Sequence, residues 1–153
     1  MKLNGVKLEC PNIAVLVLPR PDQDLVFKAQ AVLDFEEFER LCPDPLPPVR
    51  VVKGKREVVG SDPEYIRQVN AHNETRMAWI VLKSLQATEG LEWETVDMLK
   101  PETFTNYATE LKDAKFSIVE INKIVNLALQ ANALDEGKLE AARLAFLAGQ
   151  GKE

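Results

Sequence analysis

The chain of 153 residues contains one histidine, two cysteines and seven glycines, and each of these small numbers excludes a kind of chemistry. A conventional catalytic triad or a histidine-rich metal cluster would have to include His72, the single histidine. The glycines stand singly, so the phosphate-binding patterns G-x-x-x-x-G-K and G-x-G-x-x-G are absent. The sequence therefore predicts a non-enzymatic protein without metal or other cofactor, in which His72 makes hydrogen bonds at the edge of the core.

Neither the two cysteines nor the hydrophobic runs indicate a catalytic, metal-binding or membrane-spanning segment. Cys10 and Cys42 each stand next to a proline and form no C-x-x-C pair, so we expect reduced, buried thiols. The chain does not begin with an apolar run of signal-peptide length, and no window approaches the ~18 apolar residues of a membrane span. We therefore expect a cytoplasmic protein that does not contact a membrane.

Charge is unevenly distributed along the chain. The net charge of −5 argues against general nucleic-acid binding, which needs clustered lysine and arginine. Residues 1–60 carry 9 basic and 9 acidic groups, so the whole acidic excess lies in residues 61–153. The basic cluster K-G-K-R at 53–56 has no interleaved aromatic residue, and we interpret it as a solvated hairpin tip.

Residues 1–41 have the pattern of a β-rich module. Asn4-Gly5 favours a tight hairpin turn within residues 2–9. The run I-A-V-L-V-L at 13–18 predicts a strand buried on both faces, and the alternation at 25–32 predicts an antiparallel neighbour. We expect these strands to form one small sheet, followed by a short helix that Asp34 caps.

Residues 42–60 form the clearest boundary in the chain. The stretch C-P-D-P-L-P-P at 42–48 has four prolines in seven residues, which favours a stiff, extended connector. The segments 49–52 and 57–59 then have the composition of an exposed hairpin on either side of the basic cluster.

The longest helical signal runs from Ser61 to Gln86. Ser61 or Asp62 is placed to cap it, and Pro63 suits the first helical position because its missing N–H needs no partner there. Its second half is apolar nearly all round, which predicts a helix enclosed by other elements.

Three further helices are expected after it. One opens at Pro101, and another follows the capping box that Ser117 forms with Glu120. The last starts at Asp135 and is expected to end at Gly149 as a left-handed cap. The sequence thus predicts a single α+β domain, with a small N-terminal antiparallel β-sheet module followed by a mainly α-helical bundle over 61–153.

Large apolar side chains in the C-terminal half are the candidates for binding a partner. The rings in the middle of the chain suit either the core or an interface, and the last helix has few local partners for its apolar end. The candidate partner-binding residues are Trp93, Phe104, Tyr107, Leu144, Phe146 and Leu147. The sequence leaves the oligomeric state open, a homo-oligomer included.

The order of these features resembles the tail assembly chaperones of long-tailed bacteriophages. The resemblance rests on P-N-I-A-V-L-V-L-P-R, D-L-V-F-K-A-Q-A-V, F-E-E-F-E-R-L-C-P-D-P-L-P-P, D-P-E-Y-I, R-M-A-W-I-V-L-K-S-L, L-E-W-E-T-V-D, F-S-I-V-E-I-N-K-I and A-F-L-A-G, which together cover most of the chain. In that family the gene commonly ends at a ribosomal slip site, often of Gly-Lys codons, that gives a longer minority product. Gly151-Lys152 fits that pattern.

The resemblance implies a role and a set of partners. Such a chaperone binds the tape measure protein, keeps its hydrophobic helices from aggregating, helps recruit tail tube subunits and leaves the finished tail. The implied location is the host cytoplasm, outside the mature virion. The alternative is a structural virion protein, such as a tail or neck subunit, that stays in the particle.

Overall fold

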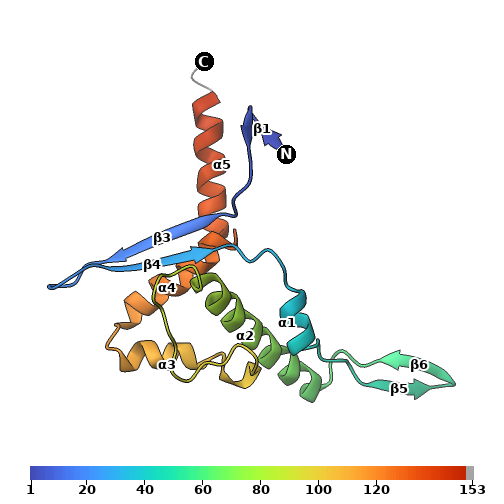
Figure 1. Cartoon of the computed structure of the whole chain (residues 1–153). Coiled ribbons are helices and arrows are strands. Elements are labelled where there is room, and N and C mark those ends of the chain that lie inside the picture. The colour runs from blue at the N-terminus through green and yellow to red at the C-terminus, as the bar shows by residue number, and fades with distance from the viewer. Residues whose placement is uncertain (151–153) are drawn as a thin grey trace.

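The computed structural model describes residues 1–150 and has the expected α+β class, with hairpins in the N-terminal part and mostly helices after them (Figure 1). The elements in chain order are β1 (Lys2–Leu3), β2 (Val6–Lys7), β3 (Ile13–Leu18), β4 (Leu25–Gln30), α1 (Glu36–Leu41), β5 (Val49–Val52), β6 (Lys55–Val58), α2 (Pro63–Leu85), a 3₁₀ turn η1 (Pro101–Thr103), α3 (Asn106–Asp113), α4 (Ile118–Ala131) and α5 (Glu136–Gln150). No helix within residues 1–150 has both the length and the apolar composition needed to cross a membrane.

The six strands form three separate antiparallel hairpins, so β1–β4 form two hairpins rather than the single sheet expected for residues 1–41. Asn4 and Gly5 have φ of 50° and 79°, so the predicted tight turn between β1 and β2 is confirmed. That hairpin does not pair with β3. The exposed Cys10 lies after β2, so the expectation that both thiols are buried was wrong for Cys10.

Strand β3 is buried on one face, not on both as its apolar run suggested. Ala14 and Leu18 are buried, whereas Ile13, Val15 and Val17 are each about half exposed. Helices α2 and α4 cover only one face of the β3–β4 hairpin. Because side chains alternate along a strand, the other face remains uncovered.

Helix α2 joins the two halves of the core. The Asp62 side chain accepts a hydrogen bond from the Tyr65 N–H at 2.9 Å, and Pro63 is the first helical residue, so the predicted helix start is confirmed. The second half of α2 is buried nearly all round, as predicted. Val81 and Leu85 face the β3–β4 hairpin and α4, and Trp79 faces the other way.

The core around Trp79 is aromatic. Its indole is fully buried and packs against the rings of Phe35 and Phe38, at centroid distances of 5.7 and 5.4 Å. Phe38 belongs to α1, whose first turn is held by the Asp34 side chain accepting a hydrogen bond from the Glu36 N–H at 2.8 Å. Phe35, rather than the predicted Asp34, occupies the capping position itself.

The third expected helix is interrupted. The backbone from Pro101 first forms the 3₁₀ turn η1, and α3 begins only at Asn106. The single hydroxyl hydrogen of Thr103 is shared between the Asp97 and Lys100 carbonyls, and its oxygen accepts a hydrogen bond from the Asp97 N–H, which holds this turn in place. Local side-chain bonds of this kind compete with regular helix.

The predicted capping box at the start of α4 is present, and Glu120 also ties this helix to the end of β3. The Ser117 hydroxyl accepts from the Glu120 N–H, and the Glu120 carboxylate accepts from the Ser117 N–H. Arg20 donates to the same carboxylate at 2.6 Å. This bond and the cap lower the pKa of Glu120 from its usual range to about 2.

We expect Glu120→Gln to destabilise the chain at neutral pH but not in acid. Glutamine preserves the capping box and removes the charge that Arg20 binds. Because the folded pKa of Glu120 is depressed, the carboxylate stabilises the fold above its unfolded pKa of about 4.3 and loses this effect as pH falls to about 2. Urea unfolding of both proteins at stepwise lower pH should show the stability gap closing. A gap that stays constant would contradict the assignment.

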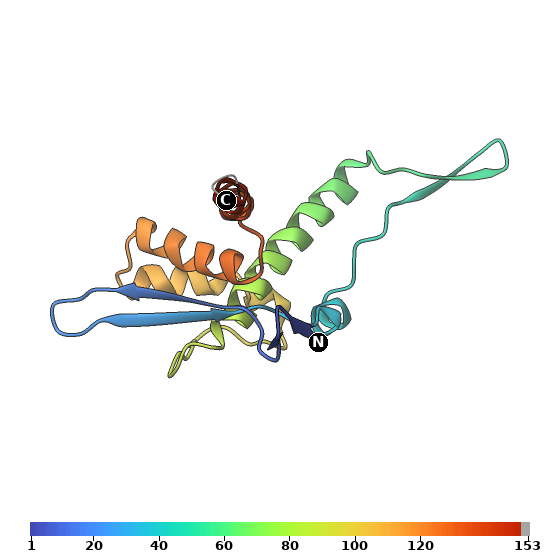
Figure 2. The ribbon, with the colours of Figure 1, turned by 90° about the horizontal axis from the view of Figure 1, so that it is seen from above.

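Besides the β1–β2 hairpin, two longer elements project from the packed body, as Figures 1 and 2 show. One is the hairpin of β5 and β6, here called the arm, which confirms the expected exposed hairpin with a tighter turn at Lys53-Gly54. The other is α5, none of whose residues is buried. Helix α5 continues through Gly149 to Gln150, so the predicted left-handed cap at Gly149 was wrong, and the tail from 151 lies outside the described residues.

Candidate functional site

Helix α5 presents large apolar side chains to solvent. It begins as predicted after Asp135, whose side chain accepts a hydrogen bond from the Lys138 N–H at 3.1 Å. The exposed fractions of its large apolar residues are 45% for Leu139, 54% for Leu144, 62% for Phe146 and 46% for Leu147. We call these four residues the α5 surface.

The α5 surface is not one narrow stripe. Leu139 and Phe146 are seven residues apart and share a face, while Leu144 and Leu147 are three apart and lie on an adjoining face. An isolated helix of 15 residues is marginal in water even with a favourable sequence, and Gly137 and Gly149 weaken this one further. Helix α5 is therefore a structural element that lacks the packing needed to stabilise it.

The other predicted binding residues do not lie on α5. Phe104 is fully buried beside Trp79, so its ring is part of the core and is not accessible to a partner in this conformation. Trp93 and Tyr107 are partly exposed, with ring centroids 6.3 Å apart in an edge-to-face arrangement. The structure thus divides the six predicted residues among α5, a Trp93–Tyr107 pair and the core.

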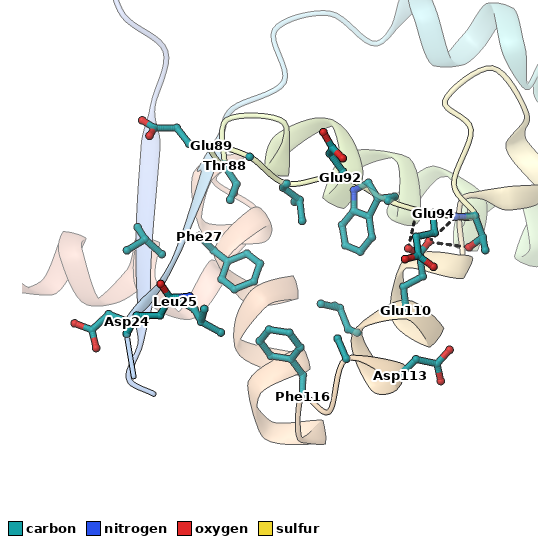
Figure 3. A pocket seen from close by; sticks show the side chains of 18 residues that line it. Asp24, Leu25, Phe27, Thr88, Glu89, Glu92, Glu94, Glu110, Asp113 and Phe116 are labelled. Atoms are coloured by element: carbon teal, nitrogen blue, oxygen red, sulfur yellow. Dashed lines mark hydrogen bonds between the residues drawn. The ribbon is translucent and has the colours of Figure 1, made fainter. Parts of the chain in front are cut away.

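Trp93 also lines a groove of about 840 Å³ between the start of β4, the loop 88–95 and the end of α3 (Figure 3). Its floor is apolar, and the rings of Phe27 and Phe116 meet there edge to face with centroids 5.8 Å apart. The size is that of many ligand-binding clefts. We call it the acidic groove for the side chains at its rim.

Six carboxylates and no lysine or arginine line the acidic groove. They are Asp24, Glu89, Glu92, Glu94, Glu110 and Asp113. Glu110 holds the loop in place, because it accepts hydrogen bonds from the Glu94 N–H at 2.6 Å and from the N–H and hydroxyl of Thr95. Burial raises the pKa of Glu110, but these hydrogen bonds outweigh burial and bring the pKa below its usual range.

Sequence reasoning did not find this groove, because three separate segments supply its carboxylates. Within each segment the acidic residues have the spacing of an ordinary solvated face. The signal that was available is the absence of lysine and arginine between Glu89 and Asp97.

A second arrangement that the sequence did not reveal surrounds the single histidine. The Cys42 Sγ lies 3.5 Å from Nδ1 of His72, and the Asp44 carboxylate lies 2.9 Å from Nε2. The three side chains have the order of a nucleophile, a base and an orienting carboxylate. Burial, and then the charge of Asp44, raise the pKa of the Cys42 thiol, which opposes formation of the reactive thiolate. The contacts instead fasten the proline-rich connector to α2, where His72 is buried at the edge of the core.

We expect iodoacetamide to alkylate Cys42 about tenfold or more slowly than Cys10 near neutral pH. Cys10 is exposed, whereas Cys42 is partly buried and its raised pKa lowers the thiolate fraction. Peptide mass spectrometry at timed intervals would give both rates, and a denatured sample would show their intrinsic ratio. Faster labelling of Cys42 than of Cys10 would mean that His72 activates the thiol.

Comparison of the chain with protein-family models, with curated proteins and with solved structures gives no match.

Proposed function

We propose that this protein is a non-enzymatic tail assembly chaperone of a long-tailed bacteriophage, which binds helices of the tape measure protein through the α5 surface. The observation that carries the proposal is α5 itself, a helix with four large apolar residues exposed and none buried. Together with the layout of the sequence, this feature favours a protein whose structure is completed by a partner.

Helix α5 has the physical properties that such a role requires. A tape measure protein must be kept soluble as an extended helical chain, so its chaperone has to cover apolar stripes on helices of another molecule. An exposed helix meets this need by packing side by side with a partner helix, and here Leu139 with Phe146 and Leu144 with Leu147 provide apolar anchors at seven- and three-residue spacing. The net charge of −5 keeps the chaperone itself soluble while those anchors are exposed.

The partly exposed pair of Trp93 and Tyr107 is the second candidate contact. Aromatic side chains dominate binding energy at interfaces, and this pair is partly exposed although both rings also pack against the core. We assign it to recruitment of the tail tube protein, which competes for Trp93 with any other occupant of the acidic groove. Phe104 has no place in this proposal, because its ring is fully buried.

Co-expression with the adjacent tape measure gene tests the proposal. The tape measure protein alone is expected in the insoluble fraction, and together with this protein it is expected in the soluble fraction as a complex. A tape measure protein that remains insoluble with an equal amount of this chain would contradict the proposal.

The alternative of a structural virion protein makes a different prediction about the finished particle. A chaperone acts in the host cytoplasm and leaves the assembled tail, so quantitative mass spectrometry of purified virions should find far fewer copies than of the tail tube protein. An abundant copy would favour the alternative. The proposed slip site at Gly151-Lys152 lies outside the described residues and is tested in the gene, by an overlapping frame beyond those codons.

A further inference from the structure

We propose that the arm of one copy docks in the acidic groove of a second copy, so that the protein assembles head to tail. This inference does not depend on the tape-measure role, because it rests on charges and shapes far from α5. Two complementary sites are present on every chain, and neither is occupied by its complement within the chain.

The arm is a projecting cationic hairpin. Every residue from Val49 to Val58 is exposed, and a two-stranded hairpin without further packing is marginally stable. Lys53 and Gly54 form its turn, with φ of 52° and 78°, which places Lys53, Lys55 and Arg56 at or beside the tip. Within residues 1–150 none of these three cations forms an ion pair, whereas Arg50 and Glu57 pair with each other farther back.

The acidic groove offers the matching charge. Asp24, Glu92 and Asp113 are exposed at its rim, and in the described part of the chain they form no ion pair. Figure 3 shows them around a centre that holds the rings of Phe27 and Phe116. A ligand for this site therefore needs cations around a small apolar portion.

The arm tip has that composition. Val51 stands opposite Arg56 and Val52 opposite Lys55 in the hairpin, so Arg56 and Lys55 each have an apolar cross-strand neighbour. The two pairs lie on opposite faces of the hairpin, and Val51 is the more exposed valine, at 69% against 36% for Val52. Insertion would cover Val51 with the apolar floor of the groove while the cations meet the carboxylates of the rim.

The two sites cannot meet within one chain. In both Figure 1 and Figure 2 the arm extends from one end of the molecule, and the start of β4, which forms one wall of the groove, lies at the opposite end. The contact must therefore join different copies through different surfaces. A single contact of this kind leaves one arm and one groove free, and these either close on each other in a two-fold dimer or join further copies in a larger ring or an open chain.

A pair of charge-reversed variants tests the inference in the full-length protein. The arm variant is Lys53→Glu/Lys55→Glu/Arg56→Glu. It retains an intact groove but has no cationic tip, so its mass by multi-angle light scattering is expected to fall to that of one chain, 17.2 kDa. The wild type under the same conditions is expected to have a larger mass, which increases with protein concentration. It should dissociate at an ionic strength of about 1 M, where the Debye screening length is about 3 Å.

The groove variant is Asp24→Lys/Glu92→Lys/Asp113→Lys, and it is also expected to be monomeric. Mixing it with the arm variant supplies one wild-type pair of arm and groove and one pair with the charges exchanged. The mixture is therefore expected to assemble from alternating copies of the two variants, although each variant alone is monomeric. Both sets of substitutions in one chain should restore assembly with the charges exchanged.

A matched control places the same three charge reversals elsewhere, as Lys2→Glu/Lys100→Glu/Lys123→Glu, at exposed positions away from both sites. It should assemble like the wild type. A monomeric wild type, an arm variant that assembles as well as the control, or a mixture that stays monomeric while both components show native circular dichroism would each overturn the inference.

Discussion

Substituting aspartate for Trp79 is expected to abolish folding. Removing a buried tryptophan side chain costs about 3–5 kcal/mol, and leaving an unpaired carboxylate in its place costs several kcal/mol more. Typical domains have only about 5–15 kcal/mol of stability. Because Trp79 packs against Phe35 and Phe38, its loss also weakens the packing of α1 on α2. Circular dichroism and urea unfolding of Trp79→Asp should show no cooperative native state.

The matched control is Ile66→Asp on the same helix. Ile66 is 46% exposed in the first turn of α2, where a carboxylate is favoured by the positive end of the helix dipole. Its unfolding free energy should stay within about 0.5 kcal/mol of the wild type. Soluble Trp79→Asp protein with a cooperative transition like that of the control would show that the core is not organised around this residue.

The double substitution Phe146→Glu/Leu147→Glu is expected to remove tape measure binding and leave the fold unchanged. Both side chains are exposed and neither belongs to the core, so the unfolding free energy should change by no more than about 0.5 kcal/mol. Covering a Phe and a Leu on binding is worth about 1.5–3 kcal/mol each, so affinity should fall by about 100-fold or more. Co-expressed tape measure protein should return to the insoluble fraction.

A control for this variant changes two leucines elsewhere that are more exposed than Phe146 and Leu147. Leu33 and Leu99 are 78% and 73% exposed and lie outside α5. The double variant Leu33→Glu/Leu99→Glu gains the same charge and should keep the tape measure protein soluble. Equal loss of solubility with both variants would mean that the partner contact is not specific to α5.

Sequence patterns predicted local structure well where local chemistry determines it. The cap at Asp62, the capping box of Ser117 and Glu120 and the turn at Asn4-Gly5 each depend on residues within a few positions of one another. The enclosed second half of α2 followed from its composition alone, because a helix that is apolar all round needs neighbours on every side.

Predictions failed where the burial or the contacts of a residue depend on segments that are distant in the chain. The sequence of β3 is apolar at every position, as in a strand that is buried on both faces. Helices cover only one of its faces, however, so the other face is exposed. The acidic groove and the Cys42–His72 contact join segments distant in the chain, and no local pattern indicates such pairings. Gly149 allows a left-handed cap without requiring one, and α5 continues through it.

The partner-binding prediction for α5 combined both kinds of reasoning. The sequence indicated a helix with large apolar residues near its end, and the structure leaves all of them exposed. For Phe104 the same reasoning failed, because an aromatic side chain suits a core as well as an interface and the surrounding residues decide between them.

Amide hydrogen exchange of α5, with and without the tape measure protein, tests the central claim most directly. In the free protein the α5 amides are expected to exchange quickly, because none of the residues of this helix is buried, while those of Val81 and Leu85 in α2 exchange slowly. In the complex the α5 amides should become strongly protected. Unchanged exchange in α5, with new protection only elsewhere in the chain, would contradict the assignment of α5 as the binding element.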